Sequence, residues 1–197
     1  PHVLLDDFQG GYMITKYLTD HGHKNIVGVF KADDMQGQNR HKGYVRALQE
    51  AEILYDPDKV VWFHTEDRKI HPYEAIREMA GKTLRGRMDA VVCYNDQTAQ
   101  LVIRALQEEG LRIPEDVSVT GYDNSSLAKP AGASADNHWT IRRKSLAPWQ
   151  QKLLLSMIQN GEKEEGIVFS SSQCLLREIP AWNTGDGLCN LTKTMPD

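Results

Sequence analysis

The chain has 197 residues, of which 40% are hydrophobic and 25% charged, with a formal net charge of -4. This composition is typical of a globular protein with room for a core, and the acidic excess argues against direct nucleic-acid binding, which usually needs a basic face. No apolar run approaches the ~20 residues that span a bilayer. The start of the chain lacks the basic segment of a secretory signal. We therefore expect a cytoplasmic protein with no membrane partner.

Up to about residue 123, helix-like and strand-like patterns alternate. The predicted helices share an apolar stripe with the period of an α-helix, and they cover residues 10–20, 38–50, 72–80 and 96–109. The predicted strands are short apolar runs, at residues 25–30, 59–63, 90–94 and 117–122. Gly22 and Gly110 follow two of these helices and are expected to end them. Alternation of this kind predicts a parallel sheet flanked by helices on both faces, an α/β fold.

Beyond residue 123 the alternation is lost. Residues 124–138 are rich in Ser, Ala, Gly and Asn and predict a loop, followed by a helix at 147–159 and a strand near 167–176. The tail from residue 182 shows no period. We therefore divide the chain into a main domain, residues 1–181, and an irregular tail, residues 182–197.

Four stretches, taken in order, resemble the effector domains of LacI/GalR-type repressors. They comprise residues 7–12 leading into 21–26, residues 40–44, residues 89–97 and residues 111–123. Residues 30–34, which depart from the Gly-Pro-type loop common in the family, together with residues 10–13 and 36–40 further resemble the arabinose repressors of Gram-positive bacteria. The resemblance weakens between residues 129 and 150, where the sequence departs from the family pattern.

This resemblance implies a periplasmic-binding-protein-like fold of type I. In the family, a further lobe and a DNA-binding module precede the helix that carries Gly10 and Gly11. We therefore expect mainly the C-terminal lobe, with the N-terminal lobe largely missing. The resemblance also implies a sensor for a small sugar, with L-arabinose as the expected effector. It further implies a homodimer that contacts DNA only through a module absent from this chain.

Ligands of open parallel sheets bind beyond the carboxyl ends of the strands. Arg40, Asn95 and Asp123 lie at or after such ends and offer a donor fork, an amide and a carboxylate, a set that suits vicinal hydroxyls. The resemblance implies the same three positions as effector contacts. Asn95 with Asp96 could equally cap a helix, and Asp123 could be a turn residue. Other side chains that could reach the cleft are Gln9, Gln36 and His64.

The sequence contains no motif that indicates catalysis. It has no nucleophile elbow, no Walker loop and no dinucleotide-binding glycine motif. The acidic pairs Asp6–Asp7 and Asp33–Asp34 are expected in loops, solvated. Cys93, Cys174 and Cys189 lack metal-ligand spacing. We therefore expect no catalytic residue, no cofactor and no metal.

Two alternatives to the sensor stay open at this stage. One is a solute-binding protein of a sugar transporter with the same fold, which would need a secretion signal. The other is a truncated remnant that folds without binding a sugar.

Overall fold

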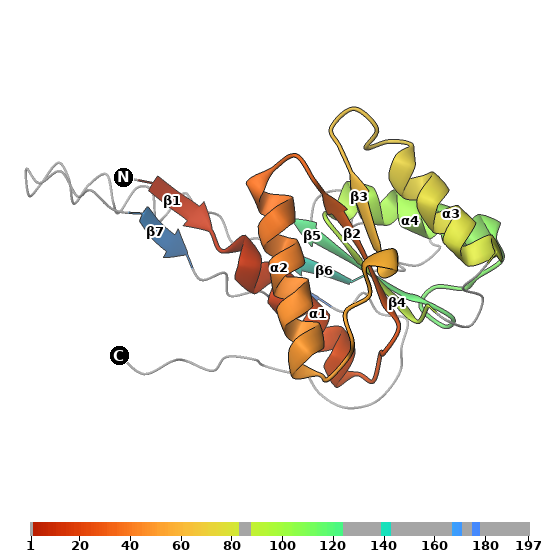
Figure 1. Cartoon of the computed structure of the whole chain (residues 1–197), viewed down its shortest axis with the longest axis horizontal. Coiled ribbons are helices and arrows are strands. Elements are labelled where there is room, and N and C mark those ends of the chain that lie inside the picture. Colours follow the sequence, from red (N-terminus) through yellow and green to blue (C-terminus); the bar gives the residue numbers. More distant parts are fainter. Residues whose placement is uncertain (1, 83–87, 124–138, 143–166, 171–174, 178–197) are drawn as a thin grey trace, which may run out of the picture.

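The computed structural model describes residues 2–82, 88–123, 139–142, 167–170 and 175–177. Its main feature is a six-stranded sheet of order β3-β2-β4-β5-β6-β8, in which only the β6–β8 pairing is antiparallel. β1 pairs in parallel with β7 in a separate two-stranded sheet, which lies beyond the start of α1 (Figure 1). The strands are β1 His2–Leu5, β2 Ile26–Lys31, β3 Val60–Phe63, β4 Ala90–Cys93, β5 Ser118–Asp123, β6 Trp139–Arg142, β7 Ile167–Ser170 and β8 Leu175–Arg177. The helices are α1 Asp7–Asp20, α2 Met35–Glu50, α3 His71–Lys82, α4 Asp96–Glu108 and the short 3-10 helix η1 Pro57–Lys59.

The predicted α/β architecture is confirmed, and each helix and strand predicted before residue 123 is present within three residues of its expected bounds. β1 and β6 were not predicted, and the single strand expected near 167–176 is two strands, β7 and β8. The predicted loop at 124–138, the helix at 147–159 and the tail fall outside the described residues. Within the described ranges, no helix is long and apolar enough to cross a membrane.

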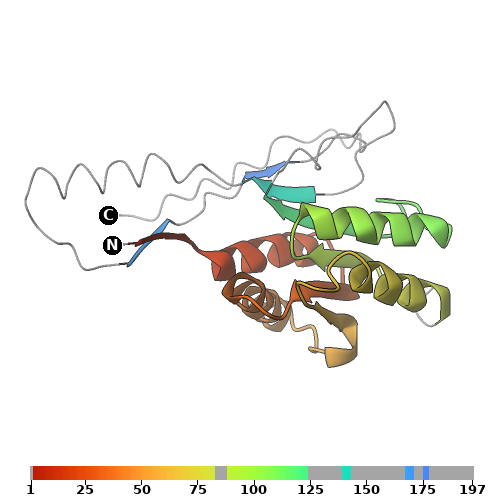
Figure 2. The same cartoon turned by 90° about the horizontal axis from the view of Figure 1, so that it is seen from above.

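Two hydrophobic clusters lie on the two faces of the sheet. Alternate residues of a strand point to opposite faces, so Val27 and Val29 of β2 join the cluster beneath α3 and α4. Ile26 and Phe30 of the same strand join the cluster beneath α1 and α2. Figure 2 shows α1 and α2 on one side of the sheet and α3 and α4 on the other. Burial on both faces explains why these strands are continuous apolar runs.

Helices α1 and α2 cross at very short range because glycines lie at the contact. A Cβ atom on Gly11 would lie 2.1 Å from the backbone oxygen of Arg40. A Cβ atom on Gly43 would lie 2.1 Å from the backbone oxygen of Phe8 and 2.4 Å from the backbone nitrogen of Tyr12. Only a residue without a side chain fits either position. The crossing brings the first two turns of α1 against the second and third turns of α2.

His41 of α2 packs in an aromatic cluster above the sheet. Its ring lies 4.7 Å from the Trp62 ring and 5.4 Å from the Phe30 ring, measured between centroids. The Tyr55 hydroxyl is 3.3 Å from Nε2. Burial disfavours the charged imidazolium and lowers the pKa of His41 below its ordinary value.

The protein should therefore lose stability as the pH falls through the range in which an exposed histidine becomes protonated. The unfolded chain takes up the proton near pH 6.5, whereas folded His41 resists it. The stabilising contribution is complete above that pH and declines below it, towards the lower folded pKa. Urea unfolding at pH 7.5 and 5.5 measures the loss, and His41→Phe should reduce it. An identical pH dependence in the variant would contradict this assignment.

Candidate functional site

The carboxyl ends of β2, β3 and β4 surround a hollow of about 210 Å³. We call it the edge hollow. Its lining is mixed, with cationic, aromatic, amide and hydroxyl side chains from three successive strand ends. The lining residues are Lys31, Phe63, Arg68, Tyr94, Asn95, Gln97 and Thr98. The volume is below the ~300 Å³ at which sites for drug-sized molecules begin, so it suits a small ligand.

Arg40 contacts Tyr94, which lines this hollow, and is almost fully buried, at 3% exposure. Its Nε and Nη2 donate to Asp7 Oδ1 at 2.9 and 2.8 Å, and its Nη1 donates to the Tyr94 backbone oxygen at 2.6 Å. The guanidinium carbon lies 3.7 Å from the centroid of the Tyr122 ring and 4.8 Å from that of Tyr94. A guanidinium carries five N–H groups. Three are engaged in these bonds, so two have no acceptor among the described residues.

Asp7 was missed as a site residue, and the prediction of a solvated Asp6–Asp7 loop is wrong. Asp6 is the N-cap of α1 and accepts from the backbone nitrogen of Gln9. Asp7 is the first residue of the helix and is buried against Arg40. The cap satisfies a free N–H of the first turn, and the glycine crossing then brings Asp7 against Arg40. An ion pair with both partners buried is held in one geometry.

Tyr94 connects several of the predicted site residues. Its hydroxyl is 2.8 Å from Asp34 Oδ2 and 3.2 Å from Gln36 Oε1. Burial is the main reason that the pKa of Tyr94 is raised, and the Asp34 hydrogen bond and the nearby Asp34 and Asp123 charges raise it further. The Tyr94 phenol therefore stays protonated and lies close to both Gln36 and Asp123.

Asp33 and Asp34 differ from each other in environment. Asp33 is exposed in the loop, as expected, where its Oδ2 accepts from Thr65 and its pKa is lowered to about 2 mainly by that hydrogen bond. Asp34 departs from the prediction, since it caps α2 by accepting from the Gly37 backbone nitrogen and binds Lys31 Nζ at 3.0 Å. This cap places Arg40 in the second turn of α2, not at the helix start.

Asn95 and Asp123 occupy the strand ends predicted for them. Asn95 is the N-cap of α4, with Oδ1 accepting from the Thr98 backbone nitrogen at 2.9 Å, so the capping alternative holds for Asn95 and not for Asp96. Because the cap uses only the oxygen, the amide N–H groups of Asn95 take no part in it. Asp123 ends β5 with a φ of 95°, a conformation that is strained for a residue with a side chain. Such strain is often found at functional sites.

Gln9 and His64 lie apart from this cluster. Gln9 is in the first turn of α1, and His64 is exposed just after β3, where its backbone nitrogen donates to Asp67. Among the described residues, no hydrogen bond joins the side chain of Gln9 or His64 to Arg40 or Asn95. The structure thus gathers four of the six predicted residues around Tyr94, namely Arg40, Asn95, Asp123 and Gln36.

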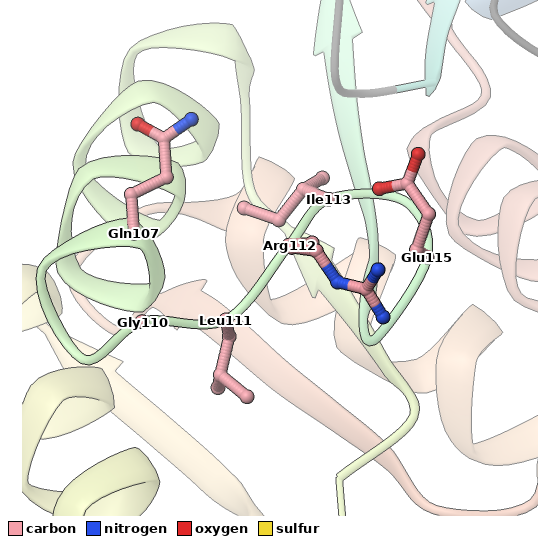
Figure 3. A pocket seen from close by; sticks show the side chains of 6 residues that line it. All are labelled: Gln107, Gly110, Leu111, Arg112, Ile113 and Glu115. Carbon is pink, nitrogen blue, oxygen red and sulfur yellow. The ribbon is translucent and has the colours of Figure 1, made fainter.

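A second hollow, of about 350 Å³, lies at the amino end of β5, remote from this cluster. Figure 3 shows it between the end of α4 and the loop that leads into β5. The lining includes Gln107, Leu111, Arg112 and Glu115. In an open parallel sheet, ligands bind at the opposite end. We therefore place the candidate site at the carboxyl edge.

Comparison with known proteins gives one matching family model and several transcriptional repressors as similar proteins. Residues 15–136 match the model of the periplasmic binding protein-like domain. The arabinose metabolism transcriptional repressor of Halalkalibacterium halodurans is 40% identical over 167 residues, 83% of this chain and 44% of the repressor. That of Geobacillus stearothermophilus is 38% identical over 128 residues, 65% of this chain and 35% of the repressor. The chain thus spans less than half the length of these two relatives.

Solved structures of LacI-family regulators have the same fold. A regulator from Enterococcus faecium with bound ribose is 29% identical, with a TM-score of 0.69 over 90% of this chain and 63% of that one. A complex of the transcriptional regulator CelR with cellobiose is 26% identical, with a TM-score of 0.75 over 90% of this chain and 52% of that one. All of these relatives are transcriptional regulators, not enzymes.

Proposed function

Because this chain belongs to the periplasmic binding protein-like domain family and its relatives are LacI-type and arabinose repressors, we propose that it is the sugar-sensing part of a bacterial transcriptional repressor. Its effector is a small neutral sugar, with L-arabinose first among the candidates. The sugar binds at the carboxyl edge of the sheet, where a second lobe would face Arg40, Asn95 and Asp123. Binding favours one arrangement of the lobes and so controls a separate DNA-binding module.

The observation that carries the proposal is the buried Arg40, which has two N–H groups without an acceptor among the described residues and contacts Tyr94 in the lining of the edge hollow. A sugar offers hydroxyl oxygens to such donors and hydroxyl protons to the Asp123 carboxylate. The amide N–H groups of Asn95 lie on the same edge. Tyr94 adds an aromatic surface to the lining. This combination of a few polar groups with aromatic surface is typical of sites for small ligands.

The transport-type solute-binding protein is less well supported. Both arabinose-related proteins are repressors, and the sugar in their names is the reason for placing L-arabinose first. As part of a repressor, the protein would act in the cytoplasm as a homodimer and reach DNA through its separate module.

A thermal-shift assay with a panel of pentoses and hexoses tests the sensor. A sugar at about one hundred times its dissociation constant should stabilise the protein by about 2.7 kcal/mol. Asp123→Gly should abolish that shift because it removes the carboxylate. Glycine accepts the positive φ without strain, so the variant should melt at the same or a higher temperature without ligand. The loss of the shift then reports binding and not misfolding.

Two outcomes would count against the sensor. A cooperative melt with no shift for any sugar would refute sugar binding by this chain. A full shift retained in Asp123→Gly would place the site elsewhere.

A further inference from the structure

The ion pair between Arg40 and Asp7 has no net charge. The buried guanidinium therefore offers a ligand no excess positive charge. Both donors on the Nε side share a single carboxylate oxygen, and the side chains are 3% and 9% exposed. Water cannot effectively screen a charge at this depth, so the carboxylate of Asp7 cancels most of the positive potential that Arg40 would otherwise produce. What Arg40 offers a ligand is two N–H donors without a net positive charge.

The other charged groups at this edge do not restore a positive site. Lys31 Nζ lies 3.0 Å from Asp34 and 3.6 Å from Asp33. Arg68 is exposed to solvent and donates to the Thr65 backbone oxygen. Asp123 adds a carboxylate at the end of β5. Among the described residues, Asp7 therefore neutralises Arg40, and acidic side chains outnumber basic ones at this edge of the sheet.

We propose that Asp7 determines the charge selectivity of the site. By neutralising Arg40, it makes the site accept neutral polyols and reject ligands of the same shape that carry a carboxylate or a phosphate. The proposal rests on the sugar-sensing function above. Asp7 itself touches Arg40 and not the ligand, so it is a positioning residue that also sets the electrostatic field.

Asp7→Asn tests this role because the amide keeps the size of the side chain and an oxygen acceptor but removes the charge. Asp6→Asn is the matched control. It makes the same change one residue earlier, and asparagine caps a helix as well as aspartate does. Calorimetric titration should give the wild type and Asp6→Asn at least a tenfold preference for L-arabinose over L-arabinonate. In Asp7→Asn that ratio should fall by at least tenfold.

A second measurement needs no sugar. At constant ionic strength, inorganic phosphate should raise the melting temperature of Asp7→Asn more than that of the wild type or Asp6→Asn, because the variant leaves Arg40 with an uncompensated charge. Equal responses of all three proteins to phosphate, or an unchanged sugar ratio in Asp7→Asn, would overturn the role of Asp7. Failure of the wild type to bind either sugar would overturn the proposed function, while the phosphate comparison would still decide whether Asp7 controls the charge.

Discussion

Replacing Asp7 with alanine should lower the free energy of unfolding by about 3–5 kcal/mol, the cost of leaving one partner of a buried ion pair uncompensated. Arg40 is too deeply buried for water to replace the lost carboxylate. Its remaining bond to the Tyr94 backbone oxygen and its stacking on Tyr122 hold it in place. Urea unfolding of the wild type and the variant measures the difference.

Asp20→Ala is the control on the same helix. Asp20 pairs with Lys16 at the exposed end of α1, and surface pairs between helical neighbours are worth only about 0.3–0.5 kcal/mol. A further test adds Arg40→Met to Asp7→Ala. Since an apolar side chain of similar volume needs no partner, the double variant should be more stable than Asp7→Ala alone. If Asp7→Ala lowers the free energy of unfolding no more than Asp20→Ala does, the ion pair between Asp7 and Arg40 is not buried in solution.

Gly43→Ala should destabilise the protein by about 1–3 kcal/mol through overpacking. The new methyl group would meet backbone atoms of α1, so the strain cannot be relieved by turning a flexible side chain. The gain in helix propensity of up to about 1 kcal/mol opposes the effect but does not cancel it. Pushing α1 away from α2 would also pull Asp7 from Arg40, which adds to the loss. Chemical denaturation followed by circular dichroism provides the measurement.

The same substitution at Gly81 of α3 serves as its control. A Cβ atom there would meet only the carboxyl end of the Glu109 side chain, at 3.2 Å, and that end can move. Gly81→Ala should therefore leave stability unchanged or raise it by up to about 1 kcal/mol. The free energy of unfolding should therefore fall in Gly43→Ala and stay unchanged or rise in Gly81→Ala. A loss at Gly81 as large as that at Gly43 would refute the steric explanation.

Much of the sheet and its helices could be predicted because the governing patterns are local. A strand buried on both faces is a short apolar run, and a helix beside it carries a stripe of apolar residues. β1 escaped prediction because its four residues have no partner nearby and pair with β7, far along the chain. β6 lies where the sequence departs from the family pattern, and its parallel partner is β5.

The sequence predicts at which edge of the sheet the candidate site lies, but not which hydrogen bonds and ion pairs its residues form. Arg40, Asn95 and Asp123 could be placed at this edge of the sheet because each lies at or after the end of a strand. The partner of Arg40 was missed because Asp7 lies 33 residues earlier, and the glycine crossing that joins them leaves no periodic signal. The adjacent residues Asn95 and Asp96 both suit a cap, and only the fold selects Asn95. The positive φ of Asp123 has no sequence signature, since it is not a glycine.

The strand pairing also has a consequence for how the chain folds during synthesis. β2, β3, β4 and β5 pair with one another, and among the described residues every member of the two hydrophobic clusters lies before residue 123. The pairing of His2 with Ile167 must wait for a much later part of the chain. Contacts between distant residues form slowly because a long loop must close first. The nascent chain should therefore form the sheet of β2 to β5 early, and β1 should pair with β7 last.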